Sequence, residues 1–211
     1  MTVAGAVILV SATGAEAADW TQNLYLRADA GAIFQQDADL SQTGAPTYTA
    51  SFSPGVRVDL AAGYNLTQSL ALEVEPGFTW NSIDSLSGHH LATGESADLY
   101  SVPILANLVY KFHATGGWTP YLGAGIGGDV GIFDGMVRNF DYSDTDLTFA
   151  YQAQAGVNYA LSDHASIGFA YKFLGTTDQS YSLRATPYYT DHLTIGGVYV
   201  HGIFVNFTWN F

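Results

Sequence analysis

Nine ionisable residues recur at alternate positions of strand-like segments and are the strongest candidates for a functional cluster. They comprise four basic and five acidic side chains: Arg27, Asp29, Arg57, Asp59, Glu73, Glu75, Lys111, Asp129 and Lys172. The positions between them are apolar, so a period of two places all nine on one face of their segments. Charges gathered in a narrow interior are tolerated when they pair and are hydrated. We therefore expect either a charge-paired plug, which we favour, or the lining of a narrow channel for ions or small solutes.

One histidine and serine have the spacing of a catalytic pair. His164-Ala165-Ser166 places a histidine and a serine two residues apart, so an extended backbone would put both side chains on one face. The pair falls at a short turn, and Ile167 follows where the motif of outer-membrane lipid A deacylases has asparagine. A lipid-modifying enzyme is therefore the third hypothesis, and we expect no catalytic residues.

Metal sites have two weak candidates. Asp141, Asp144 and Asp146 offer carboxylates at a spacing that hard cations accept, but the glycine and the terminal glutamate of an EF-hand loop are missing. The neighbouring His89 and His90 point to opposite sides of an extended chain and would need other ligands. The chain has no cysteine, so thiolate chemistry and disulfides are excluded. We expect no metal and no cofactor.

Eight segments alternate between apolar and polar or small residues with a period of two. Each is about ten residues long or slightly longer, the length that a tilted strand needs to cross a membrane. The segments are 24–34, 56–66, 70–80, 100–112, 121–132, 147–161, 165–173 and 195–211. The apolar face carries the aromatic residues and the opposite face carries the charges, the reverse of a soluble lipocalin-like barrel. The pattern predicts an all-β fold: an eight-stranded antiparallel up-and-down transmembrane β-barrel.

The connections between these segments alternate in length. Those after the second, fourth and sixth segments are short, and those after the first, third, fifth and seventh are long loops. Short periplasmic turns and long outer loops are usual in outer-membrane barrels, which predicts periplasmic termini. Tyrosines near the segment ends, such as Tyr64, Tyr110, Tyr159, Tyr100 and Tyr151, fit aromatic girdles at the two membrane interfaces.

The composition and the N-terminus agree with export to a membrane. Only 12% of the residues are charged, whereas a soluble protein usually has about 25%. Residues 1–17 resemble a secretory signal peptide without its usual basic start, and residues 18–211 form the predicted barrel domain.

The predicted loops are strongly acidic. Arg138 and Arg184 are their only basic residues, and most of the formal net charge of −13 comes from eleven acidic ones. These are Asp37, Asp39, Asp84, Glu95, Asp98, Asp134, Asp141, Asp144, Asp146, Asp178 and Asp191. Such a surface repels nucleic acid, so no nucleic-acid partner is expected, and it offers a site for an extracellular ligand.

Two stretches carry a family resemblance. Val102–Tyr110 (VPILANLVY) and Thr119–Gly128 (TPYLGAGIGG) resemble the signature of small outer-membrane barrels of the opacity, porin-family surface-antigen and OmpA/OmpW types. The resemblance implies contact with outer-membrane lipid and lipopolysaccharide, and it implies Phe211 as the residue that the barrel-assembly machinery recognises. It implies little about biochemistry, because a fold does not carry a function with it. Our leading hypothesis is a non-catalytic surface protein for envelope structure or adhesion.

Overall fold

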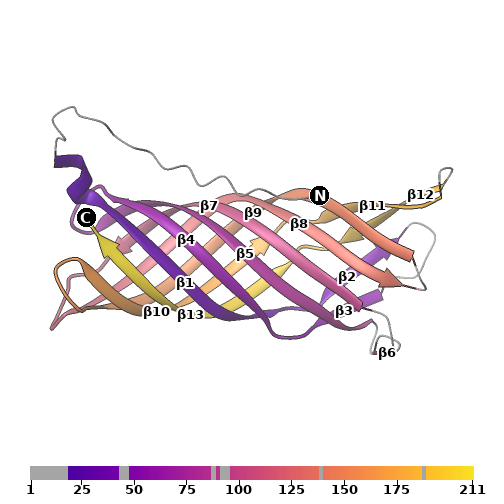
Figure 1. Cartoon of the computed structure of the whole chain (residues 1–211), viewed down its shortest axis with the longest axis horizontal. Coiled ribbons are helices and arrows are strands. Elements are labelled where there is room, and N and C mark those ends of the chain that lie inside the picture. The colour runs from indigo at the N-terminus through magenta and orange to yellow at the C-terminus, as the bar shows by residue number, and fades with distance from the viewer. Residues whose placement is uncertain (1–18, 43–47, 87–88, 91–95, 138–139, 187–188) are drawn as a thin grey trace.

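Eight antiparallel strands form a closed barrel in the computed structural model, which describes residues 19–42, 48–86, 89–90, 96–137, 140–186 and 189–211 (Figure 1). The barrel strands are β1 (Leu24–Gln35), β4 (Gly55–Asn65), β5 (Leu70–Leu86), β7 (Ser96–Lys111), β8 (Trp118–Val137), β9 (Phe140–Ala160), β10 (Ala165–Thr176) and β13 (Tyr199–Asn210). Each pairs with the next of these along the chain, and β13 also pairs with β1, so the wall has no open edge. The predicted fold class is confirmed.

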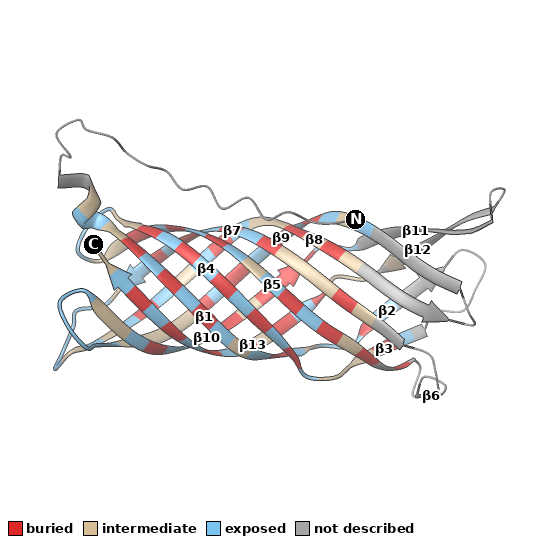
Figure 2. Cartoon of the chain, in the orientation of Figure 1, coloured by how far each residue is buried: buried red, intermediate tan, exposed pale blue. Residues whose placement is uncertain are grey.

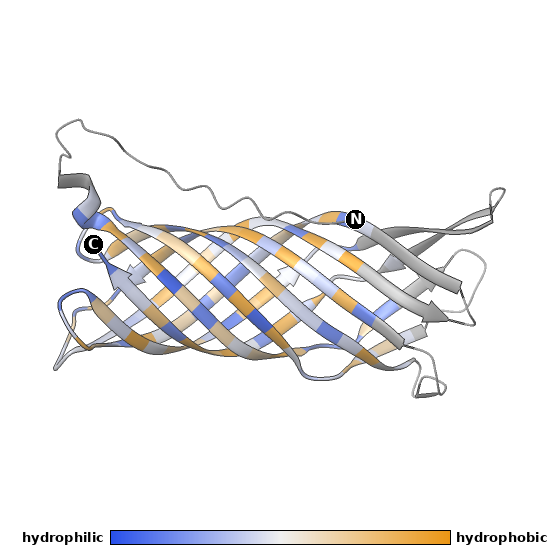
Figure 3. Cartoon of the chain, in the orientation of Figure 1, coloured by the Kyte–Doolittle hydropathy of each residue, from blue (hydrophilic) through white to orange (hydrophobic). Residues whose placement is uncertain are grey.

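Burial alternates along most of the described length of the barrel strands, which Figure 2 shows as successive bands of buried and exposed residues. On β4 the side chains of Arg57 and Asp59 are buried, whereas those of Val58 and Leu60 are 51% and 65% exposed. Hydropathy alternates in the same rhythm, as Figure 3 shows. An apolar outer face and a polar inner face are the arrangement that a lipid environment stabilises. Among the described residues, no helix is long and apolar enough to span a membrane.

The predicted long loops contain more β-structure than the sequence indicated. Several barrel strands run on past the predicted segments, and the short strands β2 (Ala38–Gln42), β3 (Tyr48–Phe52), β6 (His89–His90), β11 (Gln179–Thr186) and β12 (Tyr189–Ile195) lie in the predicted loops. We call β2, β3, β6, β11, β12 and the end of β5 that pairs with them the extension. The strands β2, β3 and β11 also alternate between apolar and polar residues, but they have five, five and eight residues, fewer than the about ten that a tilted membrane strand needs.

The opposite end of the barrel has the short connections that the sequence predicted. In the β7–β8 turn, Gly116 and Gly117 have φ angles of 60° and 86°, a conformation that glycine adopts without the clash of a side chain. The 3₁₀ turn η1 (Asp19–Asn23) leads into β1, and the backbone N–H of Phe211 donates to the Leu24 carbonyl at 3.2 Å. The predicted signal peptide, residues 1–17, lies outside the described residues.

Candidate functional site: the interior charge network

The nine charged residues predicted to share a face all lie on inward positions of barrel strands. Eight of them are 0–3% exposed, and Lys111 is partly buried. Tight contacts join seven of them, which we call the network: Arg27, Asp29, Arg57, Asp59, Glu73, Glu75 and Lys172. The network holds three positive and four negative groups, so its formal charge is −1 when every carboxylate is ionised.

Arg27 on β1 binds three carboxylates. Its Nε lies 3.0 Å from Oδ2 of Asp29, its Nη1 2.9 Å from Oε1 of Glu73 and its Nη2 2.9 Å from Oε2 of Glu75. A guanidinium presents its N–H groups as a rigid planar fork, which suits several carboxylates at once. Arg27 therefore links its own strand to β5.

Lys172 and Arg57 complete the network from β10 and β4. The Lys172 ammonium lies 2.9 Å from Asp59, 3.1 Å from Glu75 and 3.2 Å from Asp29. Arg57 lies 2.7 Å from Asp59 and 3.3 Å from Glu75. Glu75 thus contacts all three cations, which makes it the centre of the network.

Side-chain amides form further hydrogen bonds with the charged groups of the network. Gln152 on β9 accepts a hydrogen bond from Arg57 and donates one to Glu75, both at 2.9 Å. Gln154 accepts from Arg27 at 3.1 Å, and Asn107 donates to Glu75 at 3.3 Å. Buried charges are tolerated when their remaining donors and acceptors are paired in this way.

Two aromatic rings pack against the cations of the network from inside the barrel, and a third ring donates to one of its carboxylates. The Arg27 guanidinium lies 5.6 Å from the centre of the Tyr121 ring, and Arg57 and Lys172 lie 5.9 and 5.1 Å from that of Phe204. Tyr25 donates its hydroxyl to Glu73 at 2.7 Å. Sequence reasoning did not assign Tyr25 and Tyr121 to the site, although Tyr25 shares the parity of Arg27 and could have been found from it.

Lys111 and Asp129 stand apart from the network. Lys111 lies near the short-turn end, where it donates to Asn65 at 2.7 Å and lies 4.0 Å from the centre of the Tyr25 ring. Asp129 accepts a hydrogen bond from Ser101 at 2.5 Å and lines a small cavity of about 10 Å³ toward the extension. No ion pair of either residue is found among the described residues. The predicted set of nine therefore divides into a connected seven and two separate groups.

His164 and Ser166, the candidate pair of the third hypothesis, do not lie together. The His164 ring stacks on Trp209 and its Nδ1 lies 3.0 Å from the Asn210 carbonyl. Ser166 instead pairs in register with Thr208, whose side chain is buried on the inward face. The two side chains therefore lie on different sides of the wall.

The metal candidates lie mostly beyond the described side chains. Those of His89, His90, Asp141 and Asp144 are outside the described part, and Asp146 accepts a hydrogen bond from the Leu147 N–H at 3.0 Å. In the described part of the chain, no group of three or more histidine or acidic side chains is placed to hold a metal ion.

The acidic residues of the predicted loops are only partly described. Among those that are, Asp39 accepts from Thr49 at 3.2 Å and Asp98 from Ser82 at 2.8 Å, and Asp178 accepts from the Gly197 N–H at 3.0 Å. Asp39 thus joins β2 to β3 within the extension, and Asp98 joins β7 to β5 in the barrel wall. The side chains of Asp84, Glu95, Asp134, Asp191, Arg138 and Arg184 lie outside the described part.

Solved structures with this fold include proteins of several kinds. The chain superposes on the outer membrane protein OprG of Pseudomonas aeruginosa with a TM-score of 0.65 at 16% identity, over 89% of this chain and 96% of that one. The outer membrane protein AlkL gives a TM-score of 0.55 at 15% identity, over 96% and 97% of the two chains. The outer membrane protease OmpT of Escherichia coli gives 0.50 at 9% identity, over 90% and 94%. Likeness at these identities shows the fold alone.

Sequence comparisons give the family. The chain is 26% identical over 132 residues to the uncharacterized outer-membrane protein y4mB of Sinorhizobium fredii, a match that covers 63% of this chain and 56% of that protein. The chain thus spans little more than half the length of this curated relative. Residues 2–211 match the family described as outer membrane protein beta-barrel domain. The closed barrel, its apolar outer face and this match agree that the chain is a bacterial outer-membrane protein and belongs to the outer membrane protein beta-barrel domain family.

Proposed function

We propose that the protein is a non-conducting, non-catalytic barrel that anchors a surface-exposed β-structure in the outer membrane, where it serves envelope structure or adhesion. The observation that carries this proposal is the closure of the interior by the network. Its seven side chains are at most 3% exposed, so ions entering from either end meet paired charges. Eight strands leave an interior that side chains can fill, so nothing in the geometry requires an open path.

Planar-bilayer conductance of the refolded protein tests the closed interior. We expect no discrete steps at any salt concentration, while a heat-dependent gel shift demonstrates folding. A variant with Arg27→Ala and Glu73→Ala keeps the formal charge of the network at −1 but removes two long side chains, and we expect it to conduct. A control with Leu60→Ala and Val74→Ala changes only the lipid-facing wall and should stay silent. Salt-proportional steps in the unmodified protein would instead favour the narrow channel.

The surface role is supported by the charge at the extension end of the barrel. Asp37, Asp39 and Asp178 are exposed there, and the chain as a whole has a formal charge of −13. An acidic rim favours a cationic extracellular ligand and disfavours nucleic acid. The short turns at the other end support an orientation with both termini in the periplasm. Phe211 is 53% exposed at that end of the barrel.

The non-catalytic part of the proposal is supported by the separation of His164 from Ser166. A Ser166→Ala variant tests it: the variant should behave as the parent in any assay of lipid hydrolysis on outer-membrane lipid. A hydrolytic activity that the parent has and this variant lacks would favour an enzyme.

A further inference from the structure

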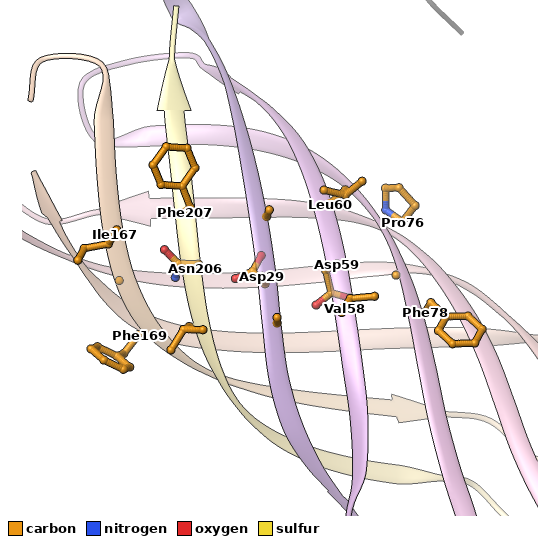
Figure 4. A pocket seen from close by; sticks show the side chains of 15 residues that line it. Asp29, Val58, Asp59, Leu60, Pro76, Phe78, Ile167, Phe169, Asn206 and Phe207 are labelled. Atoms are coloured by element: carbon orange, nitrogen blue, oxygen red, sulfur yellow. The ribbon is translucent and has the colours of Figure 1, made fainter. Parts of the chain in front are cut away.

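Asp129 is the one carboxylate among the nine inward charges that contacts no cation in the described part of the chain. Figure 4 shows Asp29 and Asp59 side by side on β1 and β4, and both contact the Lys172 ammonium, at 3.2 and 2.9 Å. Asp129 is just as buried, at 2% exposed, but the hydrogen bond that it accepts comes from the neutral hydroxyl of Ser101. A buried carboxylate without a compensating cation is costly, so Asp129 requires a partner.

The charge balance of the interior leaves no cation for Asp129. The nine inward residues comprise five carboxylates and four cations, a formal charge of −1. Arg57 already contacts two carboxylates of the network, and Lys111 lies near the short-turn end of the barrel. A single positive charge beside Asp129 would therefore bring the interior to neutrality.

The cavity of about 10 Å³ that Asp129 lines is large enough for one small ligand, because this volume is about that of one water-sized sphere. It lies next to the network on the side of the extension, since Thr79 in its wall pairs in register with Arg57. Five polar residues line it, and aliphatic side chains and Gly131 form the rest of its wall. The polar residues are Gln35, Thr79, Ser101, Asp129 and Thr176.

The strand register brings three oxygen-bearing side chains together at this cavity. Thr79 on β5 pairs with Ser101 on β7, and Ser101 pairs with Gly131 on β8, two residues from Asp129. Gly131 has no side chain, so those of Ser101 and Asp129 meet beside it. Thr79 is 4% exposed, and its Oγ1 has no hydrogen-bond partner among the described residues. An unpaired buried hydroxyl is uncommon, and its lone pairs are free for a ligand in the cavity.

The lining favours one class of ligand. Carboxylate and hydroxyl oxygens are ligands that hard cations prefer. A divalent ion such as Ca²⁺ takes six to eight oxygens, commonly from several carboxylates, and this cavity has one carboxylate. An anion would be repelled by Asp129, and an organic molecule exceeds the volume. A water molecule fits the volume but leaves the charge of Asp129 uncompensated.

We propose that this cavity binds one dehydrated monovalent cation of about the size of Na⁺, held by the carboxylate of Asp129 and the hydroxyl oxygens of Thr79 and Ser101. The ion would join β5, β7 and β8 on the side of the barrel that carries the extension. The network closes the interior on the other side, so the ion arrives from the extension end. Sequence reasoning expected no metal, because these ligands come from three strands that only the register brings together. The inference does not rest on the proposed surface role.

The dependence of stability on Na⁺ tests the site. The full chain is refolded into phosphatidylcholine vesicles and unfolded with urea, while N-methylglucamine chloride replaces NaCl so that the ionic strength stays constant. A single bound ion should lower the unfolding equilibrium constant about tenfold for each tenfold rise in Na⁺ above its dissociation constant. Asp129→Asn should remove this dependence and leave the acidic loops unchanged.

Two threonine variants separate the site from the rest of the interior. Thr79→Val keeps the shape of the side chain and should raise the Na⁺ concentration for half of the effect several-fold, so it tests the site even where Asp129→Asn does not refold. Thr208→Val is the matched control. Thr208 is also a buried inward threonine whose Oγ1 lacks a partner among the described residues, but it pairs with Arg27 and does not line the cavity. This variant should keep the full Na⁺ dependence.

Two results would overturn the proposal. One is equal stability of the unmodified protein in the two salts, because the cavity would then hold water or Asp129 would hold a proton. The other is a Na⁺ dependence that survives Asp129→Asn or Thr79→Val unchanged, because it would then arise from the acidic loops.

Discussion

At the scale of single residues, the charge balance of the network decides what each substitution does. Lys172 contacts three carboxylates, so Lys172→Met leaves two cations among four acids and changes the formal charge from −1 to −2. Removing one partner of a buried ion pair costs about 3–5 kcal/mol, because the remaining charge stays buried without compensation. We expect that loss in the free energy of unfolding, measured by urea denaturation in lipid vesicles.

The same balance predicts a partial rescue. Adding Glu75→Gln to Lys172→Met restores the formal charge of −1, so the double variant should lose less stability than the sum of the two single variants. Neighbouring residues in one network couple by about 0.5–3 kcal/mol. Asp129→Asn is the control, since Asp129 forms no ion pair among the described residues. Its effect on the free energy of unfolding should add to that of Lys172→Met. Additive effects of Lys172→Met and Glu75→Gln would show that Glu75 is not the shared centre.

At the scale of elements, the inner wall depends on glycines that make room for rings. A Cβ at Gly63 of β4 would overlap the ring of Tyr25 on the paired strand β1. Gly63→Val should therefore displace Tyr25 from Glu73 and lower the free energy of unfolding by about 1–3 kcal/mol, as overpacking of a core does. The neighbouring Ala62→Val faces lipid and should change it by less than about 0.5 kcal/mol. Equal effects of the two substitutions would mean that Tyr25 does not need the glycine.

At the scale of the whole molecule, the barrel wall does not depend on strand pairing with the β11–β12 hairpin of the extension. The hairpin of β11 and β12 pairs within itself and with β2, whereas β13 pairs with β1 and β10 in the barrel wall. Replacing residues 179–195 with a short turn should therefore leave all eight barrel strands paired. The heat-dependent gel shift should persist, while any cell-surface interaction should be lost. Failure to fold would show that the extension contributes to barrel closure.

Much of the architecture follows from the alternation of apolar and polar residues along the chain. Because side chains of a strand point alternately to opposite sides, residue order alone assigned Arg27, Asp29 and Glu75 to one face and Leu60 and Phe207 to the other. The length of each segment and the short turns then predicted eight membrane strands. The extension escaped prediction because β2 and β11, although they also alternate, have only five and eight residues, fewer than the about ten residues of a membrane strand.

Only the tertiary structure decided which charges meet. Lys172 and Asp59 are 113 residues apart in sequence, yet their side chains lie 2.9 Å apart across the interior. The alternation of side chains places both residues inside the barrel. It does not determine their positions along the barrel axis or which strands face each other across the interior. Barrel closure and the strand register determine both, and these arise from the hydrogen bonding of all eight strands together.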